Sequence, residues 1–532
     1  MGFGASRRVR GVSVWTILVL FAVFVGAVAA PRSADAFDVV VQAVGPSTNG
    51  SFVSGVWTPT ANSVLTYADL DTQLGLGNAG ITTNGAGTLT IQATFTYSGA
   101  SNRQLTLTAT GDVSIGGVTT GGTGKLSVVA NATGTVSVLN AGVVTAGGSF
   151  TASGTDCTIQ GIGVDTGSSS GGGNVNLAFS GTVVVESGGV VTGGASFTAS
   201  GTDCTIQGNG LKTGSSSGGG SVHLNFTGTV NITNAGVVTG GGSFTASGAA
   251  CTIQSNGLDT GSSSGGGSVL LTFTGAVTVK DAGVVTGGGS FAASGTDCTI
   301  ETNGLNTGSS SGGGSVHLKF SGTVVITDAG IVSGGGAVTV SGARCLIGNN
   351  GVNTGGSSGG GSVQFDFSGP VTIAGGGVVT GGGSFTSRGS TLDVSQGGVN
   401  TSGTGGGDIL VDHTGDVTIS GGGLASGGGK IKVLTRGAVD FVTAGSVTSG
   451  GGSIYVQAMT AITVDGTVSS MPGSGGVLTV TGAVAVNTAP ILGAGDISFI
   501  IGGLAVPALS VWGALALLAL IGLAAVWRLR GA

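Results

Sequence analysis

A repeat with a period of 47 residues dominates the sequence. The period is strictest at the cysteines, which lie at Cys157, Cys204, Cys251, Cys298 and Cys345 without insertion or deletion between them. A fixed period in this range indicates a repeat architecture in which each unit packs only against its neighbours. The number of structural turns in one repeat therefore decides the fold.

Each repeat divides into two halves. Glycine triplets beginning at Gly218, Gly240 and Gly265 separate segments of 22 and 25 residues. Each half holds three short runs of β-type residues, such as SVHLNF, TVNI and GVVT and then SFTAS, CTIQ and GLDT. Three strands in each half, with no helical period, predict an all-β fold. We predict a right-handed parallel β-helix with two coils per 47 residues, stacked about 4.8 Å apart.

Side-chain size explains why the repeat spans two coils. In one coil the alternation points Val222, Leu224 and Phe226 inward. The next coil presents, in the same order, Phe244, Ala246 and Gly248. Stacking therefore sets large against small side chains, as close packing at a fixed spacing requires. The predicted core contains two phenylalanine columns, one of Phe179, Phe226, Phe273, Phe320 and Phe367, and one of Phe150, Phe197, Phe244, Phe291 and Phe385.

The cysteines fit the same core. Neighbouring cysteines are two coils apart, about 9.6 Å, which exceeds the roughly 7 Å Cα separation that a disulfide tolerates. Val230 and Ile232 fill the sites equivalent to Cys251 and Ile253 one coil earlier. We therefore interpret each cysteine as a small buried hydrophobic residue and not as a metal or redox group.

Composition supports a folded rod. The chain has 115 glycines among 532 residues but only 7 prolines, and 40% of its residues are hydrophobic. Without a Gly-X-Y period, these glycines read as turns of a solenoid and not as collagen or disorder. Residues 37–527 carry 10 basic and 21 acidic residues, a net charge of −11. Since no basic patch is present, we do not expect a nucleic-acid partner.

In the predicted β-helix, the histidines are placed too far apart to form a catalytic or metal site. His223 and His317 point outward from equivalent coils that are four coils apart, about 19 Å. His413 falls in the phenylalanine column after a one-residue slip in the repeat. We expect no catalytic residue, no metal and no cofactor at these positions.

The carboxylates decide between a rod and a carbohydrate-active enzyme, because some β-helices are polysaccharide lyases or hydrolases. Such enzymes need acidic and basic side chains clustered on adjacent coils. Here Asp156, Asp203 and Asp297 recur one per repeat, and Ala250 and Arg344 replace them in other copies. We therefore predict that the chain is not an enzyme.

The N-terminus has the three parts of a secretory signal peptide. Arg7, Arg8 and Arg10 precede the apolar run 12–30, and Ala34-Asp35-Ala36 offers a cleavage site that makes Phe37 the first mature residue. The alternative is a retained N-terminal anchor.

Residues 37–112 are less regular. Ala68-Asp69-Leu70 is followed by Gly77-Asn78, an ITT strand, and two alternating strands that close on Thr110-Gly111-Asp112. This stretch resembles the opening coils of filamentous-haemagglutinin-like exported β-helix proteins. We predict that Tyr67–Leu76 is a short helix that caps the open end of the solenoid.

Residues 506–532 form a tripartite C-terminal segment. A proline-containing motif precedes the apolar run 511–527, and Arg528 and Arg530 follow it. The layout resembles the IPTL-type sorting signals of Gram-negative bacteria, with the motif Val506, Pro507, Ala508, Leu509, Ser510, Trp512 and Gly513. The resemblance implies an exosortase-like sorting enzyme as a partner. The alternative is a plain single-span membrane anchor, and in both cases the arginines place the C-terminus in the cytoplasm.

The sequence thus predicts a signal peptide (1–36), a cap with the first coils (37–112), a regular β-helix (113–420), degenerate coils (421–490), a linker (491–505) and a sorting signal with a transmembrane helix (506–532). We predict an exported, surface-displayed or membrane-anchored rod with a structural or adhesin-like role in the cell envelope or matrix. Besides secretion machinery, its partners would be a surface polysaccharide or another cell's surface. The alternatives are a carbohydrate-active β-helix enzyme and an ice- or surface-binding rod.

Overall fold

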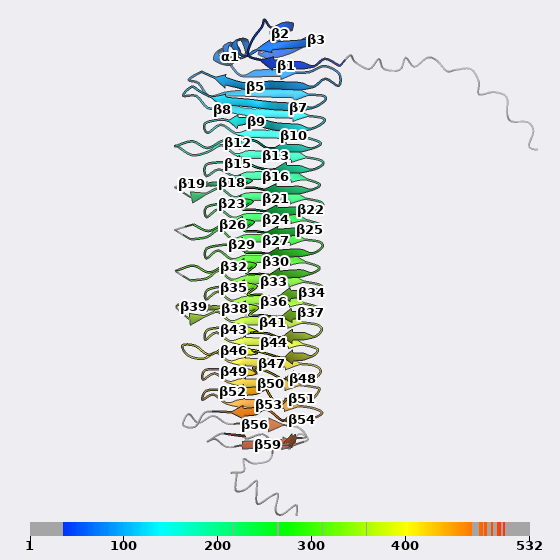
Figure 1. Cartoon of the computed structure of the whole chain (residues 1–532), viewed down its shortest axis with the longest axis vertical. Coiled ribbons are helices and arrows are strands. Elements are labelled where there is room, and N and C mark those ends of the chain that lie inside the picture. Colours follow the sequence, from blue (N-terminus) through cyan, green and yellow to red (C-terminus); the bar gives the residue numbers. More distant parts are fainter. Residues whose placement is uncertain are drawn as a thin grey trace, which may run out of the picture.

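The computed structural model describes residues 36–470, except 216–217, 263–264, 311 and 358, together with five strands between 478 and 505. The coils stack into one straight rod with a cap at its N-terminal end (Figure 1). The rod is a parallel β-solenoid of about 18 turns. The prediction of an all-β parallel β-helix is therefore confirmed.

The strands form three stacks, in which each strand pairs with the equivalent strands of adjacent coils. The first stack contains β4 (Ala79–Thr82), β6 (Arg103–Ala109), β8 (Leu126–Ala132), β10 (Phe150–Gly154), β13 (Val175–Phe179), β16 (Phe197–Gly201), β21 (Val222–Phe226), β24 (Phe244–Gly248), β27 (Val269–Phe273), β30 (Phe291–Gly295), β33 (Val316–Phe320), β36 (Val338–Gly342), β41 (Val363–Phe367), β44 (Phe385–Gly389), β47 (Ile409–His413), β50 (Ile431–Thr435), β53 (Ile454–Ala458), β56 (Leu478–Thr481) and β59 (Ile497–Ile501).

The second stack contains β5 (Leu89–Tyr97), β7 (Val113–Thr120), β9 (Val136–Val144), β11 (Cys157–Ile159), β14 (Val183–Val185), β17 (Cys204–Gln207), β22 (Thr229–Thr233), β25 (Ala250–Gln254), β28 (Val277–Lys280), β31 (Cys298–Glu301), β34 (Thr323–Ile326), β37 (Arg344–Ile347), β42 (Val371–Ile373), β45 (Leu392–Val394), β48 (Val417–Ile419), β51 (Val439–Phe441), β54 (Ile462–Val464) and β57 (Val484–Val486).

The third stack contains β12 (Val164–Asp165), β15 (Val190–Val191), β18 (Leu211–Lys212), β23 (Val237–Val238), β26 (Leu258–Asp259), β29 (Val284–Val285), β32 (Leu305–Asn306), β35 (Ile331–Val332), β38 (Val352–Asn353), β43 (Val378–Val379), β46 (Val399–Asn400), β49 (Leu424–Ala425), β52 (Ser446–Thr448), β55 (Thr467–Ser469) and β58 (Ile491–Leu492). The long strands β5, β7 and β9 span the second and third stacks in the first coils.

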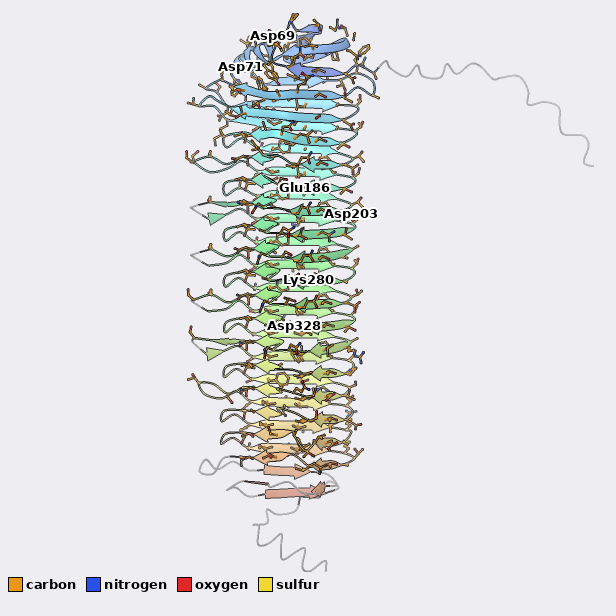
Figure 2. All side chains as sticks on the ribbon, in the orientation of Figure 1. Asp69, Asp71, Glu186, Asp203, Lys280 and Asp328 are labelled. Atoms are coloured by element: carbon orange, nitrogen blue, oxygen red, sulfur yellow. The ribbon has the colours of Figure 1, made fainter. Side chains whose placement is uncertain are left out.

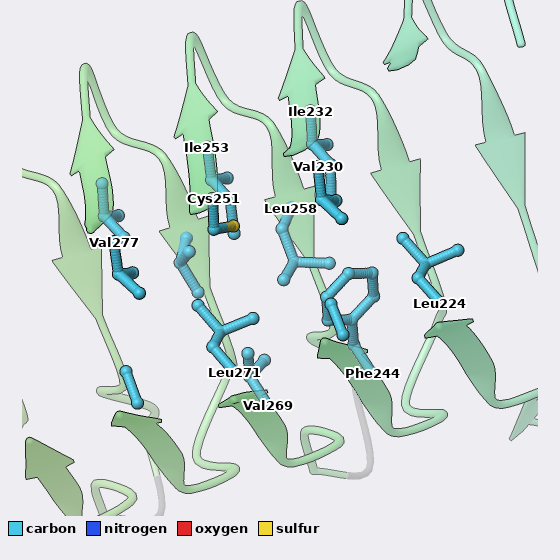
Figure 3. Packing of buried hydrophobic residues seen from close by; sticks show 14 of the residues in the cluster. Leu224, Val230, Ile232, Phe244, Cys251, Ile253, Leu258, Val269, Leu271 and Val277 are labelled. Carbon is cyan, nitrogen blue, oxygen red and sulfur yellow. The ribbon is translucent and has the colours of Figure 1, made fainter. Parts of the chain in front are cut away.

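The strand register confirms two coils per repeat. Val222 of β21 pairs with Phe244 of β24, and Phe244 pairs with Val269 of β27, so 47 residues complete two coils. The same register sets Leu224 beside Ala246. The large-on-small alternation predicted for the core is therefore present. Figure 3 shows Leu224, Phe244 and Val269 pointing into the space between the stacks.

The two phenylalanine columns occupy different depths. Phe244 and its equivalents are at most 1% exposed, whereas Phe226 and its equivalents lie at the end of their strands and are 3–7% exposed. Each of these outer rings leans over the glycine of the preceding coil: Phe226 lies over Gly201, and Phe273 over Gly248. A Cβ at Gly248 would lie 3.2 Å from the ring of Phe273 and 2.6 Å from the carbonyl oxygen of Gly228. Gly248 is therefore required because the Phe273 ring and the Gly228 carbonyl oxygen occupy the space that a side chain would need.

The N-terminal cap contains β1 (Val39–Gln42), β2 (Thr48–Val53), β3 (Val56–Thr66) and α1 (Tyr67–Leu76). The helix has the predicted bounds and buries Leu70 and Leu74. Asp71 anchors it to the first coils because its carboxylate accepts bonds from the backbone N–H and the hydroxyl of Ser98, at 3.0 and 2.6 Å. The Arg103 guanidinium donates to the carbonyl of Leu74 in the last turn (2.8 Å). The cap covers the end of the sheet, as expected for an open solenoid.

The C-terminal part differs from the predicted division. Strand pairing continues through β58 and β59, and β60 (Leu504–Ala505) pairs antiparallel with β59. The solenoid thus extends into 491–505, the segment expected to be a linker. The signal peptide (1–36) lies outside the described residues but for its last residue, and the sorting motif with the transmembrane run lies wholly outside them. Among the described residues, no helix is long and apolar enough to cross a bilayer.

Candidate functional surfaces

The recurring aspartates are bound to the backbone of the next coil. The carboxylate oxygens of Asp156, Asp203 and Asp297 accept the backbone N–H groups of Thr182, Thr229 and Thr323, at 2.7, 2.6 and 2.7 Å. Each bond joins the turns that connect the first and second stacks in two adjacent coils. The structure thus brings none of the three together with another, and it gives each a turn-stabilising role.

One of these carboxylates has a perturbed pKa. The backbone N–H and the hydroxyl of Thr229 hold the pKa of Asp203 below its ordinary value because they stabilise the charged form. The side chain is half-buried at the edge of the rod (Figure 2). Ala250 fills the equivalent position in the next repeat, so the fold tolerates the loss of this bond.

The five cysteines form an inward column. Cys204 pairs with Val230, which pairs with Cys251, so valine and cysteine alternate along the second stack. All five thiols are free, and each is at most 2% exposed. Burial raises the pKa of every one of these thiols. The five thiols thus lie buried in the inward column of the second stack.

The histidines divide as the sequence predicts. His223 and His317 are exposed on the outer face of the first stack, in β21 and β33. His413 is 2% exposed and lies in the phenylalanine column, where it pairs with Gly389. Its Nε2 lies 3.0 Å from Oγ of Ser387, a residue that replaces the alanine found at Ala246. The two polar substitutions lie in adjacent coils and hydrogen-bond to each other through Oγ of Ser387 and Nε2 of His413.

Sequence analysis missed a buried column of hydroxyl groups. A threonine or serine follows each strand of the third stack from β12 to β55 and is almost fully buried, as at Thr239 and Thr260. The hydroxyl of Thr239 donates to the carbonyl of Gly242 at 2.5 Å, and that of Thr260 donates to Gly267 at 2.6 Å. These bonds close a short loop in one coil and a long loop in the next. The sequence does contain a sign of this column, because the third run of each half-repeat, GVVT or GLDT, ends in threonine.

The long Gly/Ser loops project from one side of the rod in alternate coils (Figure 1). Two of them contain short antiparallel hairpins, β19 (Gly214–Ser215) with β20 (Gly218–Gly219), and β39 (Gly355–Gly356) with β40 (Gly359–Gly360). The loop from Thr401 to Gly407 is one residue shorter than the loop from Thr354 to Gly361. This difference accounts for the slip in the repeat and leaves the strand register intact.

The outer face of the second stack tests the idea of a regular threonine array. Thr252, Thr278 and Thr299 point outward in three successive coils. Asn231 separates this run from Thr205, and Val325 follows Thr299. Leu346 and Asp393 interrupt the same column farther along. The column is therefore irregular and does not make the flat array that an ice-binding surface would need.

Charged residues are spread along the rod. Figure 2 shows Glu186, Lys280 and Asp328 in separate coils. Within the described part of the chain, no group of three or more His, Cys, Asp or Glu side chains is arranged to hold a metal ion.

Comparison with known proteins adds no relative. No protein-family model, no curated protein and no solved structure matches the chain. The arguments below therefore rest on the fold and on the residues themselves.

Proposed function

We propose that the chain is an exported rod that is displayed on or anchored to the bacterial cell envelope and has a structural or adhesin-like role. The observation that supports this proposal most strongly is the uninterrupted stack of about 18 turns. A long rigid rod suits a protein that spaces one surface from another, because each coil depends only on its neighbours and length can change by whole repeats.

The termini complete the proposal. We propose that residues 1–36 direct export, that the coil is right-handed and resembles filamentous-haemagglutinin-like proteins, and that residues 506–532 are read by an exosortase-like enzyme or remain as an anchor. We also propose that the rod is not an enzyme. The recurring aspartates support that part because their carboxylates bind backbone groups of adjacent coils.

Deleting one whole repeat tests the proposal. Removing residues 204–250 joins equivalent positions and should shorten the rod by two coils, about 9.6 Å. We expect normal folding, normal exposure to protease added outside intact cells, and a measurable change in adhesion or envelope spacing. The matched control removes one further repeat, 251–297, and should double the change. A rod that is never exposed to external protease would contradict the proposal.

A further inference from the structure

The alternation of large and small side chains ends near the C-terminal end of the rod. Phe367 is the last ring of its column, and the following positions are Gly389, His413, Thr435 and Ala458. The period predicts phenylalanine at two of these positions, and the chain instead has the smaller His413 and Ala458. A hollow of about 440 Å³ opens here, at the ends of β41, β44, β47, β50 and β53.

The floor of the hollow is polar and uncharged at neutral pH. His413 contributes to the lining, and burial lowers its pKa to about 4. Ser387 satisfies Nε2 of this ring, whereas Nδ1 is buried without a hydrogen-bond partner of normal geometry. The Asp412 carboxylate and the carbonyl of Thr391 both favour the protonated ring, but burial outweighs them in setting the pKa of His413. The floor therefore adds no charge to the hollow.

The rim is rich in hydrogen-bond donors. Arg388 and Arg436 both line the hollow, and neither guanidinium bonds to another side chain in the described part of the protein. Gln457 accepts a bond from the hydroxyl of Tyr455 through Oε1 (3.0 Å), which leaves its amide nitrogen as a donor. Asp412 is the only carboxylate among the lining residues. Donors thus outnumber acceptors, and a matching ligand must be rich in acceptors.

Arg388, on the rim of the hollow, is not the residue that the other repeats have at this position. Equivalent positions one, two, three and four repeats earlier hold serine, at Ser341, Ser294, Ser247 and Ser200. Four of the ten basic residues of 37–527 lie between Arg388 and Arg436. The same interval also holds four aspartates, so its net charge is zero. The cations that bear on a ligand are therefore Arg388 and Arg436, which line the hollow together with the single carboxylate of Asp412.

We propose that this hollow binds a carboxylate-bearing sugar, a uronic-acid-type residue of an extracellular polysaccharide. The planar forks of Arg388 and Arg436 match a carboxylate. Gln457 and Asp412 bond ring hydroxyls, and the 70% exposed Met459 packs against the apolar face of the ring. The inference deepens the proposed function, and it rests on that proposal for the setting in which the rod meets its ligand.

The test compares two sugars that differ only in the carboxylate. Methyl glucuronoside and methyl glucoside are titrated against the full chain by NMR, with inorganic sulfate as a third probe. We expect glucuronoside to bind about tenfold more tightly than glucoside, since charge-assisted bonds are the strong ones. Arg388→Gln and Arg436→Gln should each weaken glucuronoside binding about tenfold. The matched control is Lys212→Gln, which removes one exposed charge elsewhere and should leave binding unchanged.

Three results would overturn the proposal: glucoside binding as tightly as glucuronoside, Lys212→Gln weakening binding as much as the arginine variants, or sulfate binding as tightly as glucuronoside. The last result would leave a simple anion site. Unchanged thermal unfolding of each variant shows that the rod is intact. Loss of sugar binding with surface display retained contradicts this inference alone, whereas binding without surface display contradicts the proposed function alone.

Discussion

Replacing Gly248 by alanine tests the packing rule that sets the 47-residue period. The glycine does not need a left-handed backbone, since its φ is not positive. The substitution therefore changes side-chain volume alone. The new Cβ would lie 2.6 Å from the carbonyl oxygen of Gly228 and 3.2 Å from the ring of Phe273, both closer than the 3.4 Å of an ordinary contact.

The expected cost follows from which atoms must move. The ring of Phe273 needs to shift only a few tenths of an ångström, whereas the carbonyl of Gly228 is backbone and must move by roughly 0.8 Å. That carbonyl also accepts the N–H of Ala249 at 2.6 Å. Overpacking of this kind costs about 1–3 kcal/mol. Gly248→Phe should cost more, because a second ring would compete with Phe273 for the same space.

Hydrogen exchange read coil by coil is the appropriate assay. In a solenoid the loss should stay local, so amides of 222–275 should exchange faster while distant coils keep their protection. Gly75→Ala is the matched control, because a Cβ at Gly75 in α1 meets no atom within 4 Å, and alanine should raise helix stability by up to about 1 kcal/mol. Unchanged exchange around residues 222–275 in Gly248→Ala would refute the large-on-small account.

Three further predictions concern buried polar groups. Cys251 should resist alkylation in the native protein and react after unfolding, because burial raises the pKa of its thiol; rapid labelling of the native rod would show that the thiol is not inward. Thr260→Val should cost about 1–3 kcal/mol, since the carbonyl of Gly267 loses its buried donor, and a denaturant titration with an unchanged midpoint would contradict that role. Burial lowers the pKa of His413 to about 4, below about 6.5 in the unfolded chain, so the unfolded state binds more protons between these values and the rod should lose stability as the pH falls from 6.5 to 4. Ser387→Ala with His413→Phe should abolish that loss in thermal melts at pH 7 and pH 4.5, and an equal loss in the double variant would assign it to other groups.

Most of the fold could be predicted because the same pattern of inward-facing and outward-facing residues occurs in several copies of the repeat. The alternation at Val222, Leu224 and Phe226 recurs at a fixed period, so both register and inward face followed from the sequence. The helix Tyr67–Leu76 was predictable because the open end of a solenoid needs a cap and the stretch before the regular repeats departs from their pattern.

Other features depend on contacts that no local pattern reveals. The buried hydroxyl of Thr239 follows a two-residue strand, and only the folded loop shows that it bonds the carbonyl of Gly242. The hollow beside His413 arises where two large side chains are missing from one column, which becomes visible only when five coils are stacked. The extension of strands to β60 was missed because the repeat is no longer legible after residue 421.

The most direct test of the central claim is to locate the mature protein and weigh its terminal peptides. The chain is produced from its full gene in a host that carries the cognate sorting enzyme, and intact cells are treated with external protease before mass spectrometry. The account predicts a first peptide that begins at Phe37 and coils that are cut only from outside. No peptide that contains Arg530 is expected if the sorting enzyme reads residues 506–532, whereas such a peptide would leave the plain anchor. A cytoplasmic protein that retains residues 1–36 would contradict the account.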